Sequence, residues 1–239
     1  MPDIVTSAGT VRVLTREESF AELARRINGL AVHGPASVGL SGGSTPKAFY
    51  AWAVRTGALT KEALARIDWH VSDERCVPLS SDDSNFGHAA RGMLDALGVP
   101  VARRFPWPVE LAPAEAAAAY ESAWASRSPS KAFDLCALGL GDDSHIASLW
   151  PQCPLIGQKS GPRFVATEWP GRGWRLTITE AGLAQCGSIV VLVGGAGKAA
   201  ALRAIAHGAF EPKTHPGQVL REHAHKVTWL SDQEAAAGL

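Results

Sequence analysis

Apolar residues along the chain follow two repeats that alternate with each other. Short apolar runs are typical of buried strands, and they cover 36–40, 67–72, 133–138, 163–167, 174–177 and 188–193. Stretches in which apolar residues return every three or four positions are typical of helices; they cover 15–34, 46–53, 85–97, 113–126 and 198–207, and a further helix is expected from 179. This alternation predicts an α/β fold: an open, mostly parallel sheet with helices on both faces.

Local signals support the first two helices, and no break divides the chain. Thr15 and Glu18 have the spacing of a capping box, and Pro46 suits the first turn of the second helix. The 239 residues contain no long linker, low-complexity segment or internal repeat. We therefore expect one domain over residues 1–239.

The charge balance excludes some classes of partner. The chain has 23 Lys and Arg against 23 Asp and Glu, so its formal net charge is zero. Proteins that bind nucleic acid usually carry a basic excess, so neither nucleic acid nor an acidic membrane surface is expected as a partner. The sequence contains no signal-peptide pattern and no apolar window long enough to cross a membrane. A cytoplasmic protein is the expectation.

The cysteines and histidines do not indicate a metal site. The four cysteines lack the C-x-x-C spacing of zinc or disulfide frameworks, and reduced thiols in or near the core are expected instead; they are Cys76, Cys136, Cys153 and Cys186. Four histidines crowd the C-terminal region without a metal-ligand spacing; they are His207, His215, His223 and His225. No metal is expected.

Glycine and charged residues gather directly after four of the predicted strands. They occupy 41–46, 73–75, 139–145 and 194–198. Ligands of open α/β sheets bind outside the carboxyl ends of the strands. The four segments are therefore expected to meet at one crevice.

Two of these segments suit the binding of an anion. The segment 41–45 combines glycines, hydroxyl groups and a following helix N-terminus, although it could also be a plain connection. The segment 194–198 repeats the arrangement and adds Lys198. It is not an ATP-binding P-loop, because Leu192 replaces the first Gly and Ala199 replaces the Ser or Thr that binds Mg²⁺.

Six motifs, taken in order, resemble the 6-phosphogluconolactonase family. They are LSGGSTP, SDER, SNFG, GLGDDSHIASLWP, RLTIT and VGGAGKA, and the similarity spans about residues 36–220. That family shares a Rossmann-like α/β fold with glucosamine-6-phosphate deaminases and ribose-5-phosphate isomerases. Arg75 and the sequence ASLWP resemble the lactonase branch more than the deaminases.

The resemblance implies an activity. A member of the lactonase branch hydrolyses 6-phospho-D-glucono-1,5-lactone to 6-phosphogluconate in the oxidative pentose phosphate pathway, without a cofactor or metal. Its partner is thus a phosphorylated sugar lactone, and a monomer or weak homodimer is expected. Two alternatives stay open: a deaminase or isomerase of hexosamine 6-phosphates, and a sugar-phosphate sensor domain without turnover.

The residues allow a role for each candidate in the crevice. Histidine changes protonation near neutral pH, so His145 is the expected general base that activates water. Asp73 could orient His145, hold sugar hydroxyls or cap a helix. The expected substrate-binding residues are Gly42, Gly43, Ser44, Thr45, Arg75 and Lys198 for the phosphate, Arg175 as a weaker candidate, and Asn85 for hydroxyls.

One position departs from the pattern of the family. Ser144 stands where the family usually has Gly, directly before His145. If the backbone there needs a positive φ, Ser costs about 1 kcal/mol in strain, and a different placement of the loop would change the aim of His145.

Overall fold

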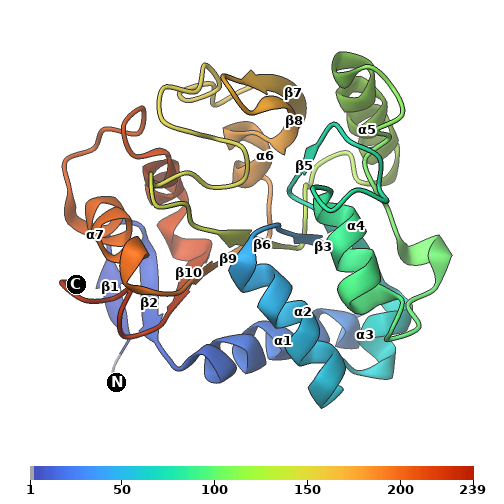
Figure 1. Ribbon diagram of the computed structural model, residues 1–239, viewed down its shortest axis with the longest axis horizontal. Helices are drawn as coiled ribbons and strands as arrows, with labels where there is room; N and C mark the ends of the chain where they lie inside the picture. Colours follow the sequence, from blue (N-terminus) through green and yellow to red (C-terminus); the bar gives the residue numbers. More distant parts are fainter. Residues whose placement is uncertain (1–2) are drawn as a thin grey trace.

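The computed structural model describes residues 3–239, and its centre is a seven-stranded sheet (Figure 1). In spatial order its strands are β1 (Ile4–Thr6), β2 (Gly9–Val13), β10 (Val227–Ser231), β9 (Ser188–Val193), β6 (Leu135–Gly139), β3 (Ala36–Leu40) and β4 (Ile67–Val71). β1 pairs antiparallel with β2, and the other neighbours pair in parallel. The expected open, mostly parallel sheet is confirmed.

A second sheet of three antiparallel strands lies apart from the first. It consists of β5 (Asp73–Arg75), β8 (Gly173–Ile178) and β7 (Phe164–Trp169), in that order. The segment 73–75, expected as a polar segment after a strand, is therefore itself a short strand. Because one residue, Ser72, separates the end of β4 from the start of β5, the chain passes directly from one sheet to the other.

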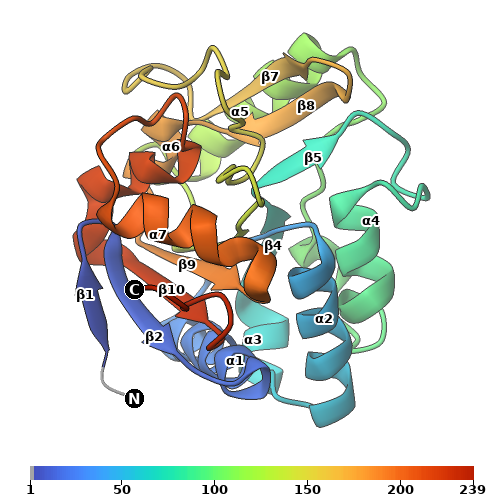
Figure 2. The ribbon, with the colours of Figure 1, turned by 60° about the vertical axis from the view of Figure 1, so that its left-hand side comes forward.

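Helices cover the sheets on two sides. They are α1 (Arg16–Val32), α2 (Ser44–Thr56), α3 (Lys61–Arg66), α4 (Asn85–Ala89), α5 (Pro113–Arg127), α6 (Glu180–Ala184) and α7 (Ala199–His207), with 3₁₀ turns at Val101–Arg103, Ala196–Lys198 and Pro216–Lys226. Figures 1 and 2 show α1, α2 and α3 below the large sheet, and α5 with the second sheet above it. The capping box at the start of α1 forms as expected.

The pattern of apolar residues does not predict several strands that are short or that contain polar residues. β1 has three residues and exposes 82% of Val5, β2 contains Arg12, and β10 buries the polar Thr228 and Ser231. α3 also escapes the pattern. The helix expected over 85–97 is shorter: α4 ends at Ala89 and a π-helical turn follows over Ala90–Leu94.

The remaining sequence expectations concern thiols, metals and membranes. All four cysteines are free, three of them buried and Cys76 partly so. Residues 3–239 contain no group of three or more His, Cys, Asp and Glu side chains that could hold a metal ion. Among the described helices, none is long and apolar enough to cross a membrane.

A buried carboxylate joins the second sheet to α4. Glu74 on β5 is fully buried and accepts four hydrogen bonds, from the backbone N–H groups of Arg75, Asn85 and Phe86 at 2.8, 2.6 and 2.8 Å and from the Ser84 hydroxyl at 2.9 Å. Two of these donors are the first N–H groups of α4, which have no partner within the helix. Burial raises the pKa of Glu74, and these hydrogen bonds oppose the shift.

Replacing Glu74 by Ala should destabilise the fold. The substitution leaves buried donors without an acceptor, at about 1–3 kcal/mol for each unsatisfied group, so we expect the free energy of unfolding to fall by about 3 kcal/mol. Urea denaturation of Glu74→Ala measures this. Glu168→Ala, which removes an exposed glutamate from β7, serves as the control and should change it by less than about 0.5 kcal/mol.

Candidate active site

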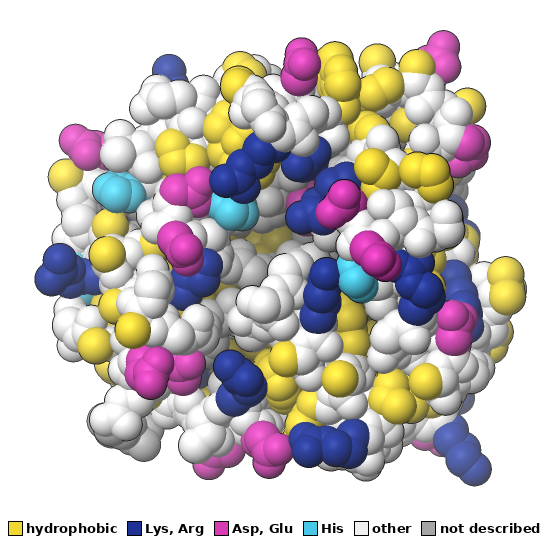
Figure 3. All heavy atoms as spheres, viewed as in Figure 1, with side chains coloured by type: hydrophobic (Ala, Val, Ile, Leu, Met, Phe, Trp, Pro, Cys, Tyr) yellow, Lys and Arg dark blue, Asp and Glu magenta, His cyan; other side chains and the backbone are white. Residues whose placement is uncertain are grey.

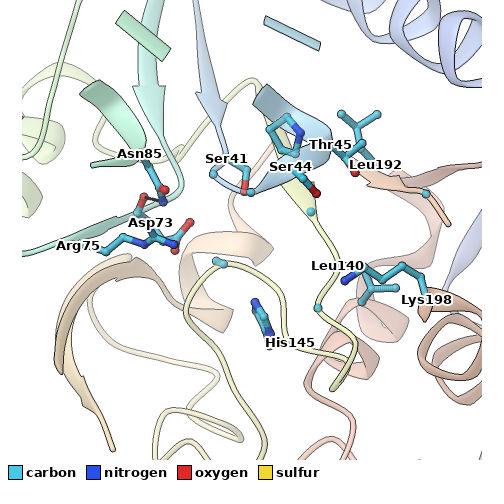
Figure 4. Close-up of a pocket in the computed structure, with 17 residues that line it drawn as sticks. Ser41, Ser44, Thr45, Asp73, Arg75, Asn85, Leu140, His145, Leu192 and Lys198 are labelled. Carbon is cyan, nitrogen blue, oxygen red and sulfur yellow. Dashed lines mark hydrogen bonds between the residues drawn. The ribbon is translucent and has the colours of Figure 1, made fainter. Parts of the chain in front are cut away.

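The four polar segments meet at one cavity of about 210 Å³. Figure 3 shows basic side chains around a hollow near the middle of the face, and Figure 4 shows the side chains that line the cavity. The cavity is lined by Ser41, Gly42, Gly43, Ser44, Thr45, Pro46, Asp73, Arg75, Asn85, Gly139, Leu140, Gly141, His145, Ala147, Leu192, Gly194 and Lys198. All the site residues expected from the sequence line this cavity, with the exception of Arg175.

The segment 41–45 brings free backbone N–H groups to one side of the cavity. It connects β3 to α2, and no side chain caps the N-terminus of α2. Gly43 has a φ of 96°, which glycine adopts without strain. A Cβ at Gly42 would lie 1.9 Å from Oδ1 of Asn85, so with Asn85 in place this position tolerates glycine alone. A helix N-terminus with free N–H groups suits an anion.

His145 lies opposite that segment and is oriented by a neighbouring carboxylate. Its Nδ1 is 2.5 Å from Oδ1 of Asp143, and because a carboxylate accepts hydrogen bonds, Nδ1 carries the proton. Nε2 is then left as the basic nitrogen. The hydrogen bond from His145 lowers the pKa of Asp143 to about 2. A Cβ at Gly141 would lie 2.0 Å from Nδ1, so the ring depends on that glycine for its place.

The carboxylate that orients His145 is therefore Asp143, which the sequence reasoning missed. The missed signal was an Asp two residues before the histidine, within a turn. Asp73, for which orientation of His145 was one expected role, is held by other groups: its Oδ2 accepts from the Ser148 hydroxyl at 2.8 Å and its Oδ1 from the Ser72 hydroxyl at 3.3 Å. Asp73 still lines the cavity, and its contact with substrate hydroxyls stays a prediction.

Asn85 borders the cavity with a fixed amide. Its Nδ2 donates to the backbone carbonyl of Asp73 at 2.8 Å. Its Oδ1 is buried, has no hydrogen-bond partner among residues 3–239, and lies against Gly42. Asn85 thus links the strand that carries Asp73 to the glycine-rich segment, and a contact with a substrate hydroxyl stays a prediction.

The two cations of the cavity lie on opposite sides of it. Figure 4 shows Arg75 beside Asp73 on one side and Lys198 on the other, with His145 between them. Arg75 donates to the backbone carbonyl of Asp83 at 2.5 Å. Lys198 forms an ion pair with Asp142, whose side chain is 77% exposed.

Arg175 lies next to the cavity but not in its lining. It pairs with Arg75 across β5 and β8 and lines a neighbouring groove with Arg75 and Arg172. Burial, together with the charge of Arg75, lowers the pKa of Arg175. The sequence placed Arg175 at a polar strand end, but of these two paired arginines Arg75 alone lines the cavity.

The backbone before His145 has the conformation that a family glycine would suit. Ser144 has a φ of 70° and is buried. This is the left-handed region in which a residue other than glycine is strained. The expected strain at Ser144 is confirmed.

Comparison with known proteins places the chain among sugar-phosphate enzymes. The family model described as "Glucosamine-6-phosphate isomerases/6-phosphogluconolactonase" matches residues 15–229. The chain is 35% identical over 218 residues to a 6-phosphogluconolactonase of Synechocystis sp., covering 88% of this chain and 87% of that protein. It is 30% identical over 235 residues to the human GDH/6PGL endoplasmic bifunctional protein, covering 93% of this chain and 29% of that longer protein.

A solved structure supports the same assignment. The structure of 6-phosphogluconolactonase from Trypanosoma brucei superposes with a TM-score of 0.79 at 25% sequence identity, covering 97% of this chain and 98% of that chain. The match in sequence and in fold extends over nearly the whole chain. The protein belongs to the glucosamine-6-phosphate isomerase/6-phosphogluconolactonase family.

Proposed function

We propose that the protein hydrolyses 6-phospho-D-glucono-1,5-lactone to 6-phospho-D-gluconate, the lactonase step of the oxidative pentose phosphate pathway. One observation carries the proposal: an oriented histidine, His145 with Asp143, faces an anion-binding segment across a single cavity. A lactone is an activated ester, so a positioned base and a water molecule are enough for its hydrolysis. The curated 6-phosphogluconolactonase with 35% identity supports this substrate over an amino sugar.

His145 acts twice in this mechanism. Its Nε2 takes a proton from water while the water oxygen forms a bond to C1 of the lactone, and Asp143 stabilises the imidazolium that results. When the bond between C1 and the ring oxygen breaks, the imidazolium returns the proton to that oxygen. The product is an open-chain acid, and the histidine is neutral again.

The remaining cavity residues hold the substrate. The N-terminus of α2, with Ser44 and Thr45, and Lys198 form the phosphate-binding side, because free N–H groups and an ammonium group attract a dianion. Arg75 and Asp73, on the other side, contact the lactone ring. Arg75 was expected from the sequence to bind the phosphate together with Lys198. Because the two cations lie on opposite sides of the cavity in Figure 4, we assign the phosphate to Lys198 and the lactone ring to Arg75.

The proposal extends to the state of the protein in the cell. We infer one domain over residues 1–239, acting as a monomer or weak homodimer in the cytoplasm without a nucleic-acid partner. Four free thiols suit a reducing compartment, and the balanced charge of the chain gives no general attraction for nucleic acid.

Replacing His145 by Ala tests the mechanism. General acid–base catalysis contributes about 10²–10⁴-fold, so His145→Ala should lower kcat by at least about 10²-fold. Acid release from fresh 6-phosphogluconolactone, followed by pH-stat and corrected for spontaneous hydrolysis, measures it. Near-normal turnover would remove His145 from the mechanism, and release of ammonia from glucosamine 6-phosphate by the wild-type protein would favour the deaminase alternative.

Replacing each of the two cations should have a different effect on the phosphorylated and the unphosphorylated lactone. Lys198→Ala should raise KM for the phosphorylated lactone about tenfold or more and leave the hydrolysis of unphosphorylated gluconolactone almost unchanged, because a charge-assisted contact contributes about 1.5–3 kcal/mol. Arg75→Ala should lower kcat/KM for both lactones. Steady-state kinetics with the two substrates separates these effects, and equal losses on both substrates for Lys198→Ala would contradict its phosphate role.

Removing Asp142 should improve phosphate binding. The exposed carboxylate of Asp142 competes with the substrate phosphate for Lys198. Since exposed ion pairs contribute up to about 1 kcal/mol, Asp142→Asn should lower KM for the phosphorylated lactone about two- to fivefold. Glu115→Gln removes the same charge from the exposed surface of α5 and should leave KM unchanged. A higher KM in Asp142→Asn would mean that Asp142 positions Lys198 instead.

A further inference from the structure

Backbone strain is concentrated in the segment that contains His145. Within residues 3–239, the residues other than glycine with a positive φ are Ser144 at 70°, Ala147 at 46° and Gln152 at 66°. Such conformations are strained in residues other than glycine, and they persist where the surrounding structure holds them in place.

One distant segment holds two of these three residues. The segment 213–217, which we name the brace, precedes and begins the 3₁₀ turn Pro216–Lys226. The backbone N–H of Gln152 donates to the carbonyl of Lys213 at 2.7 Å, and the N–H of Gly217 donates to the carbonyl of Ser144 at 2.8 Å. The brace therefore contacts the strained segment on both sides of His145.

The brace is itself fixed to α7. The side chain of Gln218, which follows the brace, is fully buried. Its Nε2 donates to the carbonyls of Ala204 at 2.9 Å and Ala209 at 2.8 Å, and its Oε1 accepts from the N–H of Glu211 at 2.6 Å. A Cβ at Gly217 would lie 2.5 Å from Cδ1 of Ile205, so the brace packs closely against this helix.

A side-chain contact adds to the backbone contacts. The hydroxyl Oγ of Ser144 lies 3.2 Å from Nδ1 of His215, in the brace. A glycine at position 144 would avoid the strain but would have no hydroxyl to make this contact. The backbone of Ser144 is thus strained, but its hydroxyl makes a contact with the brace that glycine could not make.

We propose that His215 is a positioning residue, which acts through the Ser144 hydroxyl to aim the adjacent His145 at the lactone. The role rests on the proposed function, in which His145 is the base. His215 lines no part of the cavity and so acts on the orientation of His145 and not on the substrate. A misplacement of about 1 Å in a catalytic group can lower the rate by up to about 10²-fold. Loss of the contact between Ser144 and His215 can therefore lower kcat by a measurable factor.

Four variants test the proposal. His215→Ala and Ser144→Ala should each lower kcat about tenfold, with KM within twofold of the wild type, because the phosphate contacts are unchanged. The double variant Ser144→Ala/His215→Ala should lose no more than either single variant, since both remove one contact. In Ser144→Gly/His215→Ala, kcat should recover, because glycine adopts a φ of 70° without strain and needs no side-chain attachment.

Controls separate positioning from a loss of fold. His207→Ala removes an exposed histidine at the end of α7 and should leave kcat and the thermal unfolding midpoint unchanged. His215→Asn places an amide near the position of Nδ1 and should recover most of the lost kcat. A midpoint within about 2 °C of the wild type in His215→Ala is the expected result.

Other results would overturn the proposal. They are a kcat of His215→Ala within twofold of the wild type, an additive loss in Ser144→Ala/His215→Ala, and a loss in His215→Ala that the glycine variant does not restore. If His145→Ala retains turnover, the role of His145 as the base fails instead; if the wild-type protein does not accelerate hydrolysis of the lactone, the proposed function fails, whatever the result for His215.

Discussion

The common direction of β3, β4, β6 and β9 is the constraint on which the site depends. In a parallel sheet the carboxyl ends of neighbouring strands lie at one edge. Segments that are distant in the sequence are therefore brought to one cavity, and the loops are free to carry polar side chains because the strands hold the fold. The short strand β5 adds a second constraint, since it takes Asp73 and Arg75 directly from the end of β4 into the second sheet.

Much of the fold could be predicted because the buried parallel strands have apolar sequences. The ranges 36–40 and 188–193 were predicted to the residue, and the convergence of the four polar segments followed from them. β10 could not be found in this way, since its buried Thr228 and Ser231 interrupt the apolar run. β10 pairs with β2, near the N-terminus, and with β9. These pairings place β10 in the sheet, and a local sequence pattern does not contain that information.

The sequence predicted most of the residues that line the cavity, but it did not predict all of the hydrogen bonds between them. Spacing and residue type identified His145, whereas the choice between Asp73 and Asp143 as its partner depends on the turn that the backbone makes at Gly141. Arg175 shows a related limit. Because Arg175 pairs directly with Arg75 across β5 and β8, both side chains lie on the same face of the second sheet, yet Arg75 lines the cavity and Arg175 lines only the neighbouring groove. That difference depends on where β8 lies relative to the cavity, which the sequence pattern does not contain.

The close packing of Gly42 against Asn85 links two positions that are 43 residues apart in the sequence. A side chain at position 42 would occupy the space of the Asn85 amide, and a larger side chain at position 85 would displace the glycine-rich segment. Among related sequences, the two positions should therefore vary together, and a bulkier residue at one should accompany a smaller residue at the other. In a redesign for larger phosphorylated substrates, positions 42 and 85 should therefore be changed together.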